Sequence, residues 1–315
     1  MRRGAALLAA GILAWISGAT LGTSPAPEAA AAAPLLAIGK AHASYTPLLT
    51  EGKPVFVLAI GSDSRMDNDA AIARGLGDSI HIIGINPKKN RASILGFPRD
   101  SWVNSPCAGT SKINNALAEG GPDCMVQTVE NLTGIRLDYW VLTSFTGVKD
   151  AVDEIGRLTL DVPFSMHDRY SKSDFSPGTY DLKGYDVLAF ARDRHSFGEG
   201  DFARSENQGR VLLAALEQFR REFAEDPSRL FDWIGVGERN IQTDLSLTEL
   251  LSFGFEATQF DPKKVQNMVV PGSIGMEGDQ SVVNLSNESR LYADMEKDAI
   301  VARKNMPPSP TAGER

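Results

Sequence analysis

The stretch SIHIIGINPKKNRASILGF (79–97) decides the fold of this chain. It holds two apolar runs of strand length, SIHIIGI (79–85) and ASILGF (92–97), separated by NPKKN (86–90), whose asparagine and proline are typical of turns. So short a connection predicts neighbouring antiparallel strands, because parallel neighbours need a crossover of a dozen or more residues. A third apolar run, VFVLAIG (55–61), is also of strand length. The sequence therefore predicts a buried sheet built around these three strands.

Charged residues stand at one end of the predicted sheet. Asp78 precedes the second strand, and Arg99 and Asp100 follow the third, so antiparallel pairing brings all three to the same end. Asp63 and Arg65, in the GSDSR motif that follows the first strand, join them if that strand also pairs antiparallel. Carboxylates are the ligands that Mg2+ takes beside phosphates, and guanidinium groups suit phosphate oxygens. The alternative is a solvated rim of turns, where Asp and Ser are common.

A second group of charged residues lies much later in the chain. Arg192 and Arg194 follow an apolar segment, and an extended backbone would point both to the same side. After a glycine-containing loop, Asp201 is a suitable N-cap for a helix. Asp201, Arg204 and Gln208 then share one helical face, and Arg204 in the first turn opposes the helix dipole unless an anion binds there. The alternative is the solvated surface of a charged helix.

Composition and charge exclude several classes of protein. The 315 residues are 42% hydrophobic and 23% charged, which rules out disorder throughout, collagen-like repeats and a disulfide scaffold. The net charge is −8, and because residues 1–40 carry +2, the rest of the chain carries −10. Nucleic-acid binding needs a basic face, so we expect no nucleic-acid partner. The chain contains no GxSxG motif, P-loop or HExxH motif.

The N-terminus reads as an export signal. Residues 1–22 (MRRGAALLAAGILAWISGATLG) place two arginines before a long uncharged apolar run, which is typical of a signal peptide or a signal anchor with its basic end in the cytoplasm. We expect an extracytoplasmic protein that is anchored in the membrane, or secreted if the leader is cleaved. Residues 23–40 form an Ala/Pro-rich tether, residues 41–303 the domain, and residues 304–315 a flexible tail.

Export gives a meaning to the two cysteines, Cys107 and Cys124. Outside the cytoplasm a lone pair is expected to form a disulfide. The alternative is two buried free thiols. With no pair of histidines nearby, they do not predict a zinc site.

The order of motifs along the chain resembles the LytR-CpsA-Psr (LCP) family of cell-wall glycopolymer ligases. The resemblance runs from about Val55 to Phe219 and continues more weakly over residues 220–300. The motifs that carry it are GSDSR (61–65), GDSI (77–80), GFPRD (96–100), SKINNA (111–116), LTG (132–134), DLKGYDVLAFARDRH (181–195) and GDFARSENQ (200–208). Three positions depart from the family pattern. Gly77 and Asn207 stand where arginine is common, and Arg74 is the arginine nearest to the first of them. The glycine pair that follows the VDE segment reads IGR (Ile155–Arg157) here.

The resemblance implies an α/β fold, with a single domain whose central mixed, largely antiparallel sheet is flanked by helices. It implies a Mg2+-dependent phosphotransferase, with Mn2+ as a substitute, that moves a teichoic acid-like or arabinogalactan-like polymer from a polyprenyl-pyrophosphate carrier to peptidoglycan. Asp63 and Asp78 would hold the metal, and Asp201 would help order the second motif group. The implied catalytic residues are Asp63, Arg65, Asp78, Arg99, Asp100, Arg192 and Arg194. The implied pyrophosphate-binding residues are Arg65, Arg99, Lys112, Arg192, Arg194, Arg204 and Gln208.

Two other functions fit the same residues. One is a pyrophosphatase that hydrolyses the lipid carrier, with water in place of the polymer hydroxyl. The other is a non-catalytic, membrane-anchored protein that binds polyprenyl phosphates and regulates wall synthesis. A cytoplasmic transcription regulator conflicts with the leader and with the acidic body.

Overall fold

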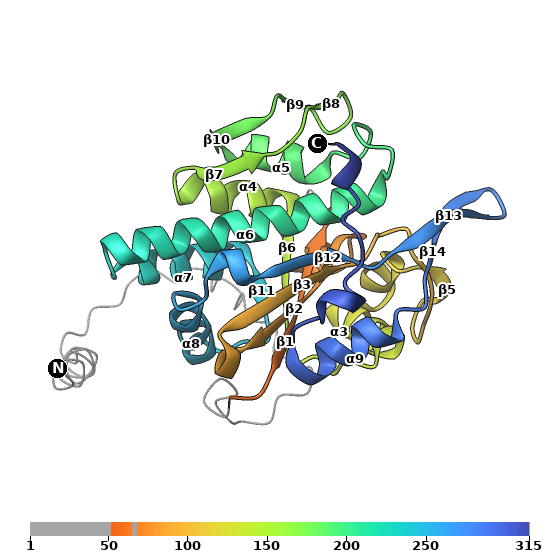
Figure 1. Ribbon diagram of the computed structural model, residues 1–315, viewed down its shortest axis with the longest axis horizontal. Helices are drawn as coiled ribbons and strands as arrows, with labels where there is room; N and C mark the ends of the chain where they lie inside the picture. Colours follow the sequence, from red (N-terminus) through yellow and green to blue (C-terminus); the bar gives the residue numbers. More distant parts are fainter. Residues whose placement is uncertain (1–51, 65–67, 315) are drawn as a thin grey trace, which may run out of the picture. The chain divides into compact units, whose positions relative to one another are not determined.

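The computed structural model describes residues 52–64 and 68–314 (Figure 1). The expected leader, the expected tether and Arg65 lie outside these residues. Among the described helices, none has both the length and the apolar character needed to span a bilayer.

The centre of the fold, within the described residues, is a sheet of six strands in the order β11–β6–β1–β2–β3–β12. The predicted antiparallel pairing of the second and third strands is confirmed, and the first strand is antiparallel to the second. Two pairs, β1 with β6 and β3 with β12, are parallel, and the other three are antiparallel, so the sheet is mixed and largely antiparallel, as expected. The strands are β1 (Val55–Ser62), β2 (Gly77–Asn86), β3 (Arg91–Gly96), β6 (Tyr139–Ser144), β11 (Gln242–Thr243) and β12 (Gln266–Val269).

One face of the sheet forms the main core with α3 (Asn115–Thr133) and α9 (Ser289–Asp298). Side chains alternate between the faces of a strand, so Leu58 and Ile60 of β1 point into this core. Val57, one residue out of phase, points to the other face, where α8 (Leu247–Ala257) packs. The continuously apolar strands of the sequence are therefore strands that are covered on both faces.

Helix α6 (Asp201–Glu225) joins this sheet to a second, smaller core. It contacts β2, β3 and β12 on one side and β7 (Leu158–Val162) on the other, as Figure 1 shows. The smaller core lies between α6, α5 (Gly184–Arg192) and a hairpin of β7 with β10 (Gly178–Leu182). One helix thus contributes side chains to both halves of the domain.

The segment that ends at Arg192 is α5, which corrects the extended conformation expected from its apolar run. Val187 and Phe190 are three residues apart and both fully buried in the smaller core. A strand would send residues three apart to opposite faces, whereas a helix brings them to one face. Packing against the hairpin therefore selects the helix.

The predicted disulfide between Cys107 and Cys124 is present. It joins the turn between β4 (Trp102–Ser105) and β5 (Gly109–Lys112) to α3. The remaining elements are α2 (Asp69–Ile72), η2 (Pro87–Lys89), α4 (Phe145–Glu154), β8 (Met166–Asp168), β9 (Ser173–Phe175), α7 (Arg229–Asn240), η3 (Pro262–Lys264), β13 (Gly272–Glu277), β14 (Gln280–Leu285), η4 (Arg303–Asn305) and η5 (Ala312–Glu314).

The C-terminal segment packs on α6, which differs from the flexible tail expected from its composition. The buried carboxylate of Glu206 accepts hydrogen bonds from Ser309 Oγ (2.7 Å) and from the backbone N and Oγ1 of Thr311 (3.2 and 2.7 Å). Arg210 also donates to Thr311 Oγ1 at 2.9 Å. Composition missed this segment because a few specific hydrogen bonds, not an apolar pattern, hold it.

Candidate active site

The charged ends of β1 and β2 lie together, as the antiparallel pairing predicts. Ser62 pairs with Gly77, so Asp63 and Asp78 follow paired positions at the same end of the sheet. Asp63 is fixed by the neighbouring strand end, since its Oδ1 accepts a hydrogen bond from Leu76 N at 2.8 Å. Its own N–H donates to Leu76 O at 2.9 Å.

Asp78 and Arg99 form an ion pair across β2 and β3. Asp78 is buried and Arg99 is mostly buried. Burial alone would lower the pKa of Arg99, but the charges of Asp78, Asp100 and Asp201 outweigh it and raise that pKa. Arg99 Nε is buried with no hydrogen-bond partner in the described part of the chain. The guanidinium of Arg99 therefore stays protonated, and its Nε–H donor has no partner among the described residues.

The start of α6 brings the second group of charges to the same place. Arg204 is buried and forms an ion pair with Asp201, whose other oxygen accepts a hydrogen bond from Asp100 N at 3.4 Å. Burial lowers the pKa of Arg204, and the nearby cations Arg99 and Arg194 lower it further, against the opposing effect of Asp201. The charged residues at the strand ends and those at the start of α6 are therefore close enough to interact electrostatically.

Asp201 is the first helical residue of α6, not its N-cap as expected. Gly200, at φ 47°, occupies the cap position and provides no side-chain cap. The Asp201 carboxylate is not free to cap its own helix because it binds Arg204 and the Asp100 amide.

Two further predicted residues complete the contacts around the strand ends. Gln208 Nε2 donates to the backbone oxygen of Asp78 at 3.2 Å, one turn beyond Arg204 on the same helical face. Lys112 Nζ lies 3.0 Å from Asp100 Oδ1. Three carboxylates of the group are therefore paired with cations, and the side chains from distant motifs converge on one site.

Arg192 and Arg194 supply the excess positive charge. The guanidinium of Arg192 lies over the Phe145 ring, 4.5 Å from its centroid. Arg194 is close enough to Arg204 to lower its pKa. Neither Arg192 nor Arg194 forms an ion pair with any residue that the structure describes. A cationic surplus next to the three ion pairs is suited to an anionic ligand.

An apolar cavity of about 210 Å³ opens at this charged end, between β1, β6, α4, α5 and α6. The cavity exists because the side chains on one face of β1 become smaller along the strand, from Val57 to Ala59 and then Gly61. Gly61 has no room for a larger side chain, since a Cβ there would lie only 2.9 Å from Ser79 Cβ. Val141, Val148, Leu188, Val211 and Leu212 are among its apolar lining residues, and Asp78, Arg192 and Gln208 are among its polar ones. The site thus combines an apolar slot with cations.

The two positions that lack the arginine of the family pattern have different settings. A side chain at Gly77 would meet the core, since its Cβ would lie 2.9 Å from the Met125 methyl group. Arg74 does not replace the missing arginine, because it donates to Glu119 O of α3 at 2.8 Å. Asn207 is fully buried, and its amide has no partner among the described residues.

A pair formed by His195 and Asp168 lies beside Arg194 and was not predicted from the sequence. His195 Nδ1 lies 2.9 Å from Asp168 Oδ2, and Tyr170 stacks on the imidazole at 4.7 Å. Burial would raise the pKa of Asp168, but the hydrogen bonds from His195 and the Tyr170 amide lower it to about 2. His195 and Asp168 are 27 residues apart in the sequence, and only the folded chain brings them together. No short sequence motif therefore identifies this pair.

The donor set at the strand ends fits Mg2+. In the described residues no three His, Cys, Asp or Glu side chains converge on a possible metal position. Mg2+, however, is usually bound by one or two carboxylates together with substrate phosphates and water. Asp63 and Asp78, at adjacent strand ends, are the two carboxylates that could hold such an ion.

Comparison with known proteins gives consistent matches. The model of the LytR_cpsA_psr family matches residues 31–302. "Polyisoprenyl-teichoic acid--peptidoglycan teichoic acid transferase TagV" of Bacillus subtilis (strain 168) is 30% identical over 229 residues, which are 70% of this chain and 57% of that protein. A TagU transferase of the same description from Bacillus cereus is 33% identical over 171 residues, 54% of each chain. The chain thus spans little more than half the length of these curated relatives. The crystal structure of B. subtilis TagV superposes with a TM-score of 0.68 at 26% identity, covering 80% of this chain and 99% of that one.

Proposed function

Because the chain belongs to the LytR_cpsA_psr family, we propose that it transfers a glycopolymer from a polyprenyl-pyrophosphate carrier to a hydroxyl of peptidoglycan. The names of the Bacillus relatives, which specify teichoic acid transfer to peptidoglycan, support this reaction. The polymer is teichoic acid-like or arabinogalactan-like. The product is a phosphodiester that links the polymer to the wall.

The observation that carries the proposal is the position of Arg192. It lies at an apolar cavity together with Asp78 and Gln208, and no carboxylate of the described chain neutralises it. A polyprenyl pyrophosphate has a long apolar chain next to a doubly negative headgroup. An apolar slot lined by Arg192, which has no ion-pair partner among the described residues, matches both parts of that molecule at once.

The contacts of each residue indicate its role in the proposed reaction. Arg192 and Arg194, which form no ion pair within the described part of the chain, bind the incoming pyrophosphate oxygens. Asp201 holds Arg204 and, through the Asp100 amide, the strand end that carries Arg99. The full set that contacts the headgroup is Arg65, Arg99, Lys112, Arg192, Arg194, Arg204 and Gln208.

The transfer is a displacement at phosphorus. The acceptor oxygen forms a bond to the phosphorus that bears the glycan, and the bond from that phosphorus to the bridging oxygen breaks. Polyprenyl phosphate leaves with the bond electrons, and the hydroxyl proton passes to one of the carboxylates Asp63, Asp78 or Asp100. Charge grows on the equatorial and leaving oxygens, and fixed guanidinium groups stabilise it without reorganisation.

We assign metal binding to Asp63 and Asp78, with Mg2+ as the ion and Mn2+ as a substitute. The ion would neutralise charge on the pyrophosphate and make the carrier phosphate a better leaving group. Arg99 already pairs with Asp78, so the same carboxylate would be shared between the metal and the guanidinium. The lipid-linked donor and the wall acceptor place the protein outside the cytoplasm and anchored at the membrane.

The test incubates the purified protein with a lipid-linked pyrophosphate glycan, Mg2+ and peptidoglycan oligomers. Mass spectrometry should detect the phosphodiester-linked product and released polyprenyl phosphate. Arg99→Ala and Arg192→Ala should each lower the transfer rate by about 10²–10³-fold, the usual loss for one group that stabilises developing charge. Arg221→Ala removes an exposed arginine from the distal part of α6 and should transfer like the parent.

Other outcomes of this assay distinguish the proposed transfer from the two alternative functions. Release of polyprenyl phosphate without any need for the acceptor would identify a pyrophosphatase. Tight binding of the carrier without turnover would identify a regulator. Full activity of both arginine variants would contradict the site assignment.

A further inference from the structure

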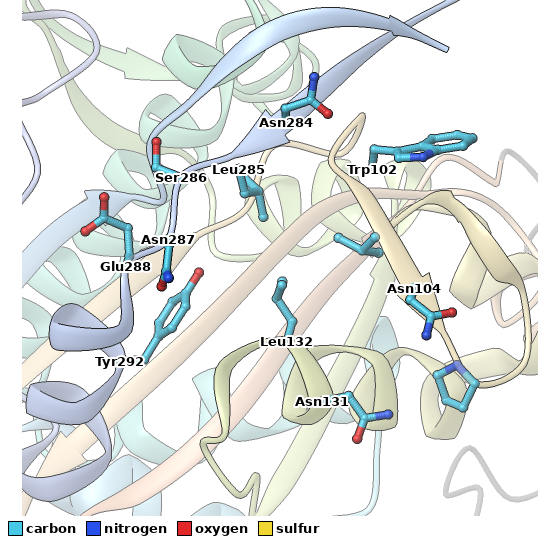
Figure 2. Close-up of a pocket in the computed structure, with 12 residues that line it drawn as sticks. Trp102, Asn104, Asn131, Leu132, Asn284, Leu285, Ser286, Asn287, Glu288 and Tyr292 are labelled. Carbon is cyan, nitrogen blue, oxygen red and sulfur yellow. The ribbon is translucent and has the colours of Figure 1, made fainter. Parts of the chain in front are cut away.

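A second and larger cavity, of about 820 Å³, is lined by Trp102 and Asn104 of β4, the strand that follows Arg99 and Asp100 in the chain (Figure 2). It is enclosed by β4, the C-terminal part of α3, the end of β14 and the start of α9. The volume is within the range of sites that bind small molecules or short oligomers. None of the described residues assigned to the pyrophosphate site lines it.

The rim of this cavity is rich in free amide groups. Asn104, Asn131 and Asn284 line it, all three are exposed, and none of their side-chain amides forms a hydrogen bond within the described chain. Each amide offers two donors and an acceptor, which is the complement of neighbouring hydroxyl or acetamido groups. Among the residues that the structure describes, the lining includes no Lys or Arg, and Glu288 is its one charged residue. A phosphate-bearing ligand would therefore be repelled, whereas an uncharged polyhydroxylated ligand would not.

The floor and one edge of the cavity are apolar or aromatic. Figure 2 shows Leu132, Leu285 and Tyr292 pointing toward a common hollow, with the indole of Trp102 at the rim. Burial raises the pKa of Tyr292, so its hydroxyl stays protonated and can donate. A pyranose ring has an apolar face of C–H groups and an edge of hydroxyls. Aromatic rings together with amides match those two surfaces.

The backbone connects this cavity to the catalytic strand end. Val283 N donates to Asp100 O at 2.9 Å, and Ser101 and Val283 form a parallel bridge. Trp102 and Asn284 directly follow these two bridged residues. A chain bound in the cavity would therefore pass within a few residues of Asp100.

We propose that this cavity binds an uncharged stretch of the saccharide chain that takes part in the transfer, a proposal that rests on the proposed function. Both the glycan strand of peptidoglycan and the carbohydrate part of the donor have this chemistry. The amides bind hydroxyl and acetamido groups, the aromatic rings cover the sugar faces, and the cavity holds the chain beside the reacting phosphorus.

The binding test uses a β-1,4-linked tetramer of N-acetylglucosamine, titrated into the intact protein and followed by calorimetry and tryptophan fluorescence. The parent should bind the tetramer in the millimolar range or tighter. Trp102→Ala and Asn284→Ala should each raise Kd by about tenfold, the loss expected for one contact group. Gln259→Ala, an exposed amide outside the cavity, should not change Kd. Because Asn284 is exposed and unbonded, its variant should keep the melting temperature of the parent.

Arg192→Ala separates this proposal from the proposed function, since it should lower the transfer rate by about 10²–10³-fold and leave tetramer binding intact. Steady-state transfer by Asn284→Ala then identifies the source of the saccharide. A raised KM for peptidoglycan identifies the acceptor strand, and a raised KM for the lipid-linked glycan identifies the donor. Absence of tetramer binding by an active parent overturns the proposal, as does unchanged KM for both substrates in a variant that no longer binds the tetramer.

Discussion

His81 is a buried histidine between the sheet and α6, and its surroundings keep it neutral. The ring is fully buried, Nε2 lies 3.0 Å from Ser205 O, and Nδ1 lies 3.1 Å from Ser79 Oγ. Burial lowers its pKa to about 4, against the raising effect of the Ser205 carbonyl. The sequence placed His81 in a strand, but the helix that covers it comes from a distant part of the chain. Its titration could not have been predicted without the fold.

We predict that His81 makes the protein sensitive to mild acid. The unfolded chain takes up a proton near pH 6.5 and the folded chain only near pH 4. Stability is therefore fully present above pH 6.5 and falls as the pH drops toward 4, by about 3 kcal/mol over this window. Urea unfolding at pH 7.5 and 4.5 measures the loss. His81→Gln should lack this part of the loss, while His167→Gln, which changes an exposed imidazole, should retain it. Equal acid sensitivity of His81→Gln and the parent would contradict the assignment.

At the scale of elements, strand pairing was predictable and the apolar cavity was not. The turn between residues 85 and 91 fixes β2 beside β3, and this alone brings Asp78 to Arg99. The cavity depends on Ala59 and Gly61 facing Leu188 across a gap between a strand and a helix. The spacing of apolar residues in a single sequence does not show which residues of a strand face which residues of a helix. This spacing also did not identify α5 as a helix.

We predict that filling the cavity selects against long lipid carriers. Ala191→Phe places a ring among the lining residues of α5, next to Arg192. Transfer from a long-chain polyprenyl donor should fall at least about tenfold, because its buried apolar area is lost. Transfer from a short-chain donor analogue, measured in the same assay, should change little. Ala302→Phe, at an exposed position, is the control, and an equal loss with both donors would argue against a lipid slot.

The disulfide stabilises the element that carries Trp102 and Lys112. Cys107 and Cys124 are separated by 17 residues, and closing such a loop in the unfolded chain is worth about 3 kcal/mol in the chain-entropy model. We predict that reduction lowers the unfolding free energy by roughly this amount. Thermal melting with and without dithiothreitol measures it. A Cys107→Ala/Cys124→Ala double variant should melt like the reduced parent and should not respond to the reagent. A parent that melts identically in both conditions would contradict this.

At the scale of the whole molecule, the order of motifs gave the family, the sheet and the convergence of the charged residues. Arg99 and Arg204 meet although they are separated by more than a hundred positions, because α6 crosses the end of the sheet. The sequence did not predict isolated contacts between single residues on different elements. The pairs of His195 with Asp168 and of Thr311 with Glu206 are of this kind.

We predict that the C-terminal segment contributes to global stability. Removing residues 307–315 takes three hydrogen bonds from the buried carboxylate of Glu206. The expected cost is about 2–3 kcal/mol, since bonds to a charged group are stronger than average and a buried acceptor is left unsatisfied. Denaturant unfolding of this truncation, compared with one that removes only residues 313–315, measures it. Equal stability of the two truncations would show that Ser309 and Thr311 do not matter.

Helix α6 has a wider consequence, because it is part of both cores and also carries Asp201, Arg204 and Gln208. The spacing between these side chains and the strand ends depends on how the helix is tilted, and the tilt depends on the β7–β10 hairpin that packs against it. Sequence drift in that hairpin can therefore alter turnover while every substrate-contacting residue is retained. Related proteins with identical catalytic motifs need not work at the same speed.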